Sequence, residues 1–307
     1  MAMISANGVE LHVERMPARN SPGTAAPPTV VFVHGMLIDS LISYYFTLAA
    51  VFAAAGLDVI MYDQRGHGRS ERPPSGYLLE DSLGDLDALL DGLQVTGPVH
   101  LVGYSYGGTI AFGYAALRPD RVASVSMIES EPATEAWSRK MAVNLERAAA
   151  GFAEAAGDEG LAEEHGPFVT RRVQSASRLL HTTTLARDIP ASRVLDEDEI
   201  RSVRCPVLAV YGSESELAAQ EPWLKSLLTD CRTVVVPNQE HWILLGATQV
   251  VSDLIMAWIL NHEAAHRPDR SPPAQSSPAR PREAATRDPG TQDTRAREAR
   301  TAEVEHR

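Results

Sequence analysis

The amino-acid sequence predicts an α/β domain in which a mostly parallel central sheet is flanked by helices. Two observations carry this prediction. Short apolar runs alternate with longer segments of helical periodicity, and the short runs are apolar throughout rather than at every second position. Such alternation is typical of parallel sheets with helices on both faces. With 307 residues and 44% hydrophobic content, the chain is long enough to bury a large core.

The strands are expected where short apolar runs end in turn-forming residues. Asn7-Gly8 is a two-residue hairpin signal ahead of the first run. The predicted strands are 9–13, 29–35 (TVVFVHG), 57–62, 99–104, 121–128, 206–211 and 232–236. Between most of them, apolar residues recur at helical spacing, as in the leucines of 79–93. The predicted helices are 43–55, 79–93, 107–117 and 248–260.

One interval departs from this alternation. Residues 133–200 are rich in Ala, Glu and Arg and contain no convincing strand, so we predict a helical cap inserted into the core domain. The core itself is then formed by residues 1–132 and 201–263. From 264 to 307 almost no large apolar residues remain. Such a segment cannot bury enough surface to offset its ordering entropy, which predicts a disordered tail.

Composition excludes several classes of partner. The net charge of -12 disfavours nucleic acid and strongly anionic membranes, which bind basic surfaces. No apolar stretch reaches the ~20 residues that a membrane span needs. The first residues lack a signal-peptide pattern, so we expect a cytoplasmic protein. Cys205 and Cys231 are expected to be reduced core residues, because two cysteines make neither a disulfide framework nor a metal site.

The strongest motif is Gly103-Tyr104-Ser105-Tyr106-Gly107, which matches G-x-S-x-G between a predicted strand and a predicted helix. In this context the motif is a nucleophile elbow. The glycines permit a sharp turn in which neighbouring backbones approach closely. The serine hydroxyl is then held at a helix N-terminus, where backbone N–H groups favour developing negative charge. Ser105 is therefore the predicted nucleophile.

Two further motifs add to the elbow: His34-Gly35-Met36 at the end of an early strand, and the run DQRGHGRS over residues 63–70. With these, the sequence resembles the α/β-hydrolase superfamily over about residues 4–262. The resemblance implies that the backbone N–H groups of Met36 and Tyr106 form an oxyanion hole. It implies a structural role for the 63–70 loop. Phosphate binding is the alternative, although the loop lacks a G-K-[ST] ending. We expect His34 to be structural.

The general base is predicted to be His241, which follows the last strand and precedes the terminal helix. The catalytic histidine of the superfamily occupies this place, and an imidazole can accept and return a proton near neutral pH. None of the other nine histidines occupies a comparable position.

The acid of the triad departs from the pattern of many superfamily members. They carry it three residues after the glycine that ends the strand before last, which here is Gly212, and the corresponding position is Ser215. Some members instead use the end of the strand after the nucleophile helix, where this sequence has Glu129. We predict that Glu129 orients the imidazole, with Glu216 and then Glu214 as alternatives.

These residues predict a serine hydrolase that cleaves an ester or thioester of a small to medium apolar acyl group through an acyl-enzyme. Serine at the elbow argues against epoxide and haloalkane hydrolysis, because the corresponding superfamily members carry Asp there. Two alternatives stay open. One is a C–C bond hydrolase, or an enzyme that releases or cyclises a biosynthetic acyl chain. The other is a non-catalytic ligand-binding protein of the same fold. We expect a small-molecule acyl substrate and neither cofactor nor metal. The sequence does not indicate an oligomeric state.

Overall fold

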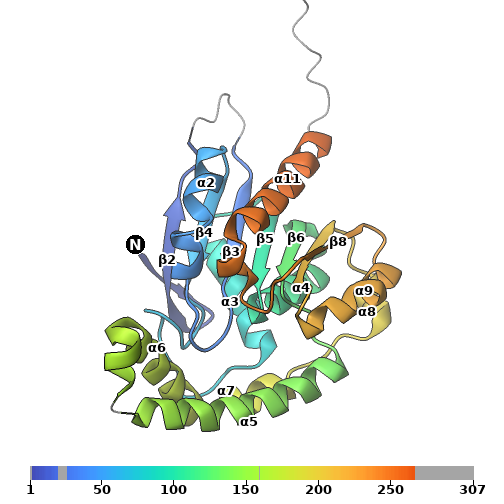
Figure 1. The fold of residues 1–307 in the computed structure, drawn as a ribbon. Coiled ribbons are helices and arrows are strands. Elements are labelled where there is room, and N and C mark those ends of the chain that lie inside the picture. The colour runs from blue at the N-terminus through green and yellow to red at the C-terminus, as the bar shows by residue number, and fades with distance from the viewer. Residues whose placement is uncertain (1, 20–25, 159, 267–307) are drawn as a thin grey trace, which may run out of the picture. The chain divides into compact units, whose positions relative to one another are not determined.

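The central feature of the fold is one eight-stranded sheet with the order β1-β2-β4-β3-β5-β6-β7-β8 (Figure 1). The structure is a computed structural model that describes residues 2–19, 26–158 and 160–266. β1 and β2 pair antiparallel, as do β2 and β4, and every other pairing is parallel. The strands are β1 (Ala2–Ala6), β2 (Val9–Met16), β3 (Thr29–Val33), β4 (Asp58–Tyr62), β5 (Val99–Tyr104), β6 (Val122–Ile128), β7 (Val207–Gly212) and β8 (Cys231–Val236). The predicted mostly parallel α/β sheet is confirmed.

Helices cover both faces of the sheet (Figure 1). The longer ones are α3 (Leu79–Gly92), α4 (Tyr106–Leu117), α5 (Glu135–Gly157), α6 (Leu161–Thr182) and α11 (Thr248–His266). The shorter ones are α1 (Ile42–Tyr45), α2 (Ala49–Ala54), α7 (Leu185–Asp188), α8 (Glu197–Arg201), α9 (Glu221–Leu227) and α10 (Ile243–Gly246), with 3-10 turns at Pro119–Arg121, Ile189–Ala191 and Glu216–Gln220.

Two elements differ from the predictions. The predicted helix 43–55 is wrong as one piece, because the chain turns at 46–48 and forms α1 and α2. β1 was not predicted, although the hairpin signal beside it was. Asn7 and Gly8 have φ of 50° and 78°, the positive values that a type I′ turn requires, and β1 pairs with β2 across them.

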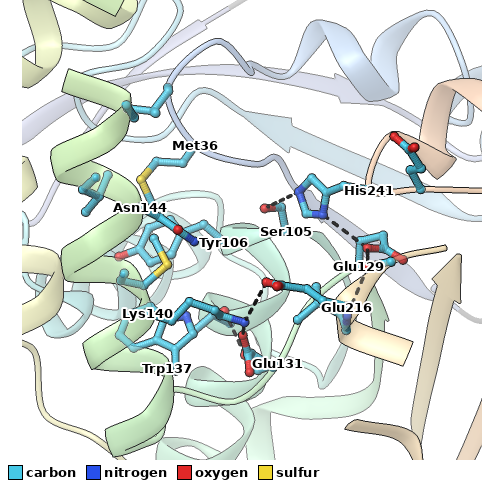
Figure 2. Close-up of a pocket in the computed structure, with 18 of the residues that line it drawn as sticks. Met36, Ser105, Tyr106, Glu129, Glu131, Trp137, Lys140, Asn144, Glu216 and His241 are labelled. Atoms are coloured by element: carbon cyan, nitrogen blue, oxygen red, sulfur yellow. Dashed lines mark hydrogen bonds and ion pairs between the residues drawn. The ribbon is translucent and has the colours of Figure 1, made fainter. Parts of the chain in front are cut away.

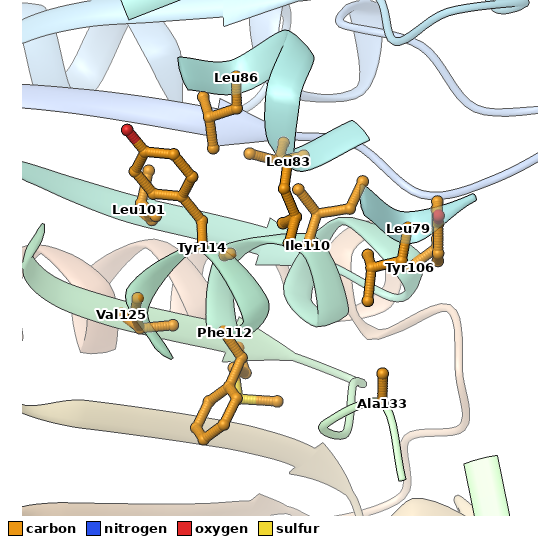
Figure 3. Close-up of a cluster of buried hydrophobic side chains, with 14 of the residues drawn as sticks. Leu79, Leu83, Leu86, Leu101, Tyr106, Ile110, Phe112, Tyr114, Val125 and Ala133 are labelled. Atoms are coloured by element: carbon orange, nitrogen blue, oxygen red, sulfur yellow. The ribbon is translucent and has the colours of Figure 1, made fainter. Parts of the chain in front are cut away.

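The core consists of two buried clusters, one on each face of the sheet. Successive strand side chains point to opposite faces, so Val31 and Val33 belong to one cluster while Val30 and Phe32 belong to the other. On the first face α3 packs on α4, and α4 packs on β5 and β6 (Figure 3). On the second face the cluster joins the sheet to α1, α2, α10 and α11. The elbow of the predicted nucleophile is therefore held between packed layers.

The interval 133–200 contains α5 to α7, all but the last residue of α8, and no strand within its described residues. α6 contains a kink where Gly166 has φ 78° just before Pro167. That this interval acts as a cap stays a prediction. α11 continues to His266, three residues into the predicted tail, and residues 267–307 lie outside the described residues. Within the described part of the chain, no helix combines the length and apolarity needed to cross a bilayer.

Candidate active site

Ser105 occupies a sharp turn between β5 and α4. Its backbone has φ 52° and ψ −123°, a strained conformation for a residue with a side chain. A Cβ atom at Gly107 would lie 2.0 Å from the carbonyl oxygen of Val33, and one at Gly103 would lie 2.2 Å from that of Gly107. Only glycine permits this close packing of strand, turn and helix. The turn places the Ser105 hydroxyl at the first turn of α4.

His241 lies on the loop between β8 and α10 and points its imidazole at the serine (Figure 2). Its Nε2 is 3.1 Å from Ser105 Oγ, within hydrogen-bond distance. The Tyr104 hydroxyl donates a hydrogen bond to the His241 carbonyl oxygen at 2.8 Å and so holds the loop. The side chain of His241 is 43% exposed, which leaves the imidazole accessible to water.

Glu129 follows β6 directly and completes a line of three side chains. Its Oε2 is 3.2 Å from His241 Nδ1, and its side chain is fully buried. The backbone N–H of Gly212 donates to Oε1 at 2.5 Å, and the Ser215 hydroxyl donates to Oε2 at 2.6 Å. A buried carboxylate needs such donors to offset its lost hydration. The structure thus brings together the predicted nucleophile, base and first-ranked acid.

The alternative acids line the same cavity but make no hydrogen bond to the imidazole among the described residues. The Glu216 side chain is 77% exposed and lies 3.8 Å from Lys140 Nζ. Lys140 forms a closer ion pair with Glu131 (Figure 2). Glu214 is exposed.

Ser215 makes a contact that the sequence analysis did not predict. Its position was noted only because a carboxylate was expected there, whereas its hydroxyl bonds the same Glu129 oxygen that faces His241. Two features of the sequence together could have indicated this contact. Serine stands at 215, where many superfamily members carry the acid, and a glutamate stands at 129, at the other strand end that some members use.

The two predicted oxyanion donors border the cavity in front of Ser105. Tyr106 is the first residue of α4, and its N–H is among those that a helix leaves without an intrahelical partner. Met36 belongs to the loop after β3. The next residue, Leu37, has φ 64° and donates its N–H to His67 Nε2 at 2.9 Å. On the other side of Met36, the N–H of Gly35 donates to Asp39 at 2.6 Å. Bonds on both sides therefore fix the orientation of Met36.

The residues of the 63–70 loop act as structural links. Asp63 accepts hydrogen bonds from the N–H groups of Leu41 and Arg69, each at 2.9 Å, and contacts His12 Nδ1 at 2.8 Å. Arg65 forms a buried ion pair with Asp85. These contacts connect the loop to β2, to α3 and to the segment just before α1.

Two buried histidines connect the Met36 loop to the 63–70 loop. His34 accepts from the N–H of Gln64 at Nε2 and donates from Nδ1 to the Gly35 carbonyl at 2.6 Å, so both ring nitrogens are bonded within the protein, and its structural role stays a prediction. His67 contacts the Arg65 carbonyl through Nδ1 while Nε2 accepts from Leu37. Burial, reinforced by the neighbouring His34, lowers the pKa of His67 to about 3. The imidazole is therefore neutral and able to accept.

Two cavities meet at Ser105. The first, of about 630 Å³, has a mixed wall, with polar and charged side chains such as Lys140 and Glu131 beside apolar ones such as Trp137 and Met141. The second, of about 380 Å³, lies between α1, α6 and α10, and its walls are largely apolar. Met36, Ser105 and His241 border both. A carbonyl at Ser105 can therefore carry one substituent into each cavity.

Other reactive groups lie away from this centre. Cys205 and Cys231 are free and half-buried. Burial raises the pKa of the Cys205 thiol to about 12. Among the described residues, no cluster of three or more His, Cys, Asp or Glu side chains is arranged to hold a metal ion.

Comparisons with known proteins agree with this architecture. The family model for the alpha/beta hydrolase fold matches residues 28–163. An epoxide hydrolase of Caballeronia sordidicola is 37% identical over 124 residues, which are 40% of this chain and 34% of that protein. A non-heme chloroperoxidase of Streptomyces lividans is 33% identical over 103 residues, 34% of this chain and 37% of that protein. The chain thus matches only about a third of the length of these two relatives.

Longer matches are found at lower identity. A 2-(acetamidomethylene)succinate hydrolase of Mesorhizobium japonicum is 28% identical over 233 residues, covering 70% of this chain and 82% of that protein. The crystal structure of the enol-lactonase from Burkholderia xenovorans LB400 superposes with a TM-score of 0.64 at 22% identity, covering 84% of this chain and all of that one. This likeness concerns the fold. The chain has the α/β-hydrolase fold, and its residues 28–163 match the family model for that fold.

Proposed function

We propose that the protein is a serine hydrolase that cleaves an ester or thioester of a small to medium apolar acyl group. The observation that carries this proposal is the pair of consecutive contacts from Ser105 Oγ to His241 Nε2 and from His241 Nδ1 to Glu129 Oε2. A hydroxyl, an imidazole and a buried carboxylate in this order can pass a proton from nucleophile to leaving group.

The first half-reaction forms the acyl-enzyme. Ser105 Oγ attacks the carbonyl carbon while His241 Nε2 accepts its proton, and Glu129 stabilises the resulting imidazolium. The N–H groups of Met36 and Tyr106 bind the developing oxyanion, each contributing about 3–4 kcal/mol on the scale of donors removed from other enzymes. The imidazolium then protonates the departing alcohol or thiol as the bond to the carbonyl carbon breaks.

The second half-reaction consumes water. His241 removes a proton from a water molecule that attacks the acyl carbon, and the imidazolium returns this proton to Ser105 as the acid is released. The exposed imidazole edge supports this step, because solvent reaches it. The same carboxylate contact also weighs against a non-catalytic binding protein, an alternative that the absence of an acid at position 215 would favour.

Several relatives are named epoxide hydrolases, including those of Caballeronia sordidicola and Mycobacterium tuberculosis. Such enzymes of this superfamily carry Asp at the elbow, as noted above. This chain has Ser105 there. An ester panel therefore addresses the proposed chemistry more directly than an epoxide panel.

The test is covalent labelling with a fluorophosphonate, followed by mass-spectrometric mapping, alongside hydrolysis of nitrophenyl esters and acyl thioesters. We expect the phosphonyl group on Ser105, and loss of labelling and turnover in Ser105→Ala without a large fall in melting temperature, because the change removes one oxygen. Full ester turnover by Ser105→Ala would contradict the proposal. Labelling of Ser105 with no hydrolysis of any ester or thioester would favour the C–C bond or acyl-release alternatives.

A further inference from the structure

We propose that the second cavity at Ser105 is a binding site for a hydrocarbon chain of the substrate, and that Phe168 is a specificity-determining residue of its wall. This inference rests on the proposed function, because the chain must belong to a molecule whose carbonyl reaches Ser105. It adds a substrate class in which a hydrocarbon chain occupies the second cavity and the rest of the molecule lies in the first.

The first argument is the character of the cavity wall. Large apolar side chains from three helical regions line it: Ile42 and Phe46 in and after α1, Phe168 in α6, and Trp242 and Leu245 beside and within α10. Phe46 is 77% exposed, Leu245 65% and Trp242 54%. A cluster of large exposed apolar residues is unusual on a soluble domain and indicates a binding site. Because this cavity ends at Ser105, the substrate is the molecule positioned to cover it.

The second argument is that the charged and hydroxyl side chains of the wall are already bonded within the protein. Asp39 accepts from the N–H groups of Gly35 and Ser40 and from the Ser43 hydroxyl. Arg172 donates to the Ile38 carbonyl and lies 3.8 Å from Asp39.

Two more hydroxyls of the same wall follow this pattern. Tyr104 donates to the His241 carbonyl oxygen, and the Thr47 hydroxyl donates to the Ser43 carbonyl. A polar substituent entering here would lose its hydration without gaining these groups as partners. The cavity therefore selects for hydrocarbon.

The first cavity provides the contrast. Lys140, Asn144 and Glu216 line it from α5 and from the loop after β7, and Asn144 and Glu216 are exposed. A polar substituent can remain hydrated there or exchange hydrogen bonds with these groups. Trp137, Met141 and Leu217 also line the first cavity, so it can accept a polar or an apolar remainder of the substrate, whereas the second cavity fits the hydrocarbon chain.

Phe168 offers a sharp test of this division. It follows the Gly166–Pro167 kink of α6, and its ring lies 5.4 Å from the guanidinium carbon of Arg172. It borders both the apolar cavity and a neighbouring groove of about 860 Å³. The adjacent Val169 is also exposed on α6 but lines neither cavity. The same substitution at 168 and 169 therefore separates the effect on the cavity from the effect on the helix.

The experiment compares Phe168→Gln with Val169→Gln in two substrate series. One series lengthens the acyl group, from p-nitrophenyl acetate to octanoate, and the other lengthens the alcohol, from ethyl to octyl acetate. In one of the series, we expect Phe168→Gln to lower the kcat/KM ratio of long over short substrate about tenfold, equivalent to ~1.4 kcal/mol of lost apolar contact. The series affected identifies which side of the ester enters the cavity. Val169→Gln should leave both ratios unchanged.

The proposed hydrocarbon-chain site would be overturned if the two substitutions had equal effects. It would also be overturned if Phe168→Gln left the long-over-short kcat/KM ratios unchanged in both series. If the wild-type protein is labelled at Ser105 but shows no preference for chain length, the hydrocarbon-chain site is wrong, whereas the proposed serine-hydrolase function still stands. Retention of turnover by Ser105→Ala would remove both proposals.

Discussion

At the scale of single residues, Glu129 and Ser215 explain how an acid reaches His241 from the end of β6. The Glu129 carboxylate is fully buried and accepts from the Gly212 N–H and the Ser215 hydroxyl while it faces Nδ1 of the imidazole. Burying a carboxylate without such donors costs several kcal/mol (of order 1–3 kcal/mol for each missing hydrogen bond). Ser215 therefore belongs to the support of the acid.

The prediction at this scale is that Ser215→Ala weakens both the fold and the proposed reaction. Loss of one donor to a charged group should reduce the free energy of unfolding by about 1–3 kcal/mol and kcat by up to about tenfold, since the acid becomes less firmly held. Urea unfolding and ester kinetics measure the two effects. Ser213→Ala is the matched control, because the Ser213 hydroxyl accepts from the Asn238 N–H, whereas the hydrogen bonds of the Glu129 carboxylate among the described residues go to Gly212, Ser215 and His241. A kcat unchanged in Ser215→Ala would show that the hydroxyl does not position the acid.

Residue-level prediction from the sequence is most specific where a motif fixes local geometry and least specific where distant segments meet. Ser105 stands out because its glycines and its flanking strand and helix are contiguous. The first-ranked acid could be inferred only by comparing two strand ends. The contact between Glu129 and Ser215 joins positions 86 residues apart, so no local sequence pattern predicts it.

At the scale of elements, two loops at the ends of β3 and β4 form one unit through His34 and His67. The imidazole of His34, in the first loop, accepts a hydrogen bond from the Gln64 N–H of the second loop. The imidazole of His67, in the second loop, accepts one from the Leu37 N–H of the first. Leu37 has positive φ, a conformation that costs free energy unless its surroundings impose it. The His67 bond supplies part of that constraint next to the proposed oxyanion donor Met36.

This unit predicts an acid-sensitive stability. The folded-state pKa of His67 is lowered to about 3 by burial, below the ordinary value of 6.5. As pH falls below 6.5, the unfolded chain takes up a proton that the folded imidazole does not, so stability present above pH 6.5 is lost progressively toward pH 3. The slope is at most about 1.4 kcal/mol per pH unit for this one group.

Replacing His67 with Gln, whose side-chain oxygen can accept from Leu37, should flatten the stability profile between pH 6.5 and 5. Urea unfolding of the wild type and His67→Gln across this range provides the measurement. Parallel profiles would mean that His67 does not stay neutral in the folded protein.

Element prediction also had physical limits. β1 is short, with exposed and half-buried residues, and its strand conformation comes from pairing with β2 rather than from its own apolar pattern. The break between α1 and α2 and the approach of Phe168 to the apolar cavity depend on tertiary packing. Helical periodicity predicts that α6 exists, but not which cavity its kinked second half borders.

At the scale of the whole molecule, the parallel part of the sheet assembles the site. Met36, Ser105 and Glu129 follow β3, β5 and β6, and His241 follows β8, so all four lie beyond the carboxyl ends of parallel strands. Open α/β sheets bind ligands at this edge. The proposed site agrees with this rule, whereas the shape of the two cavities depends on the helices between 133 and 200.

The composition of residues 267–307 predicts that they contribute little to the folded domain. Truncation after His266, the last residue of α11, should leave the melting temperature and ester turnover unchanged, because the removed segment has few large apolar residues to bury. Differential scanning calorimetry and the ester assay test this. Loss of the thermal transition in the shortened protein would show that the segment packs on the domain.

The central claim is that Ser105 acts with a carboxylate at the end of β6, and the most direct test compares kcat of Glu129→Gln with that of Glu216→Gln. Loss of the acid lowers kcat on the order of 10⁴-fold in a protease triad, so we predict a fall of at least ~100-fold for Glu129→Gln and less than ~10-fold for Glu216→Gln. Both proteins should still fold, as far-UV circular dichroism can verify. A Glu129→Gln variant with near-wild-type kcat, or a larger loss in Glu216→Gln, would contradict the account.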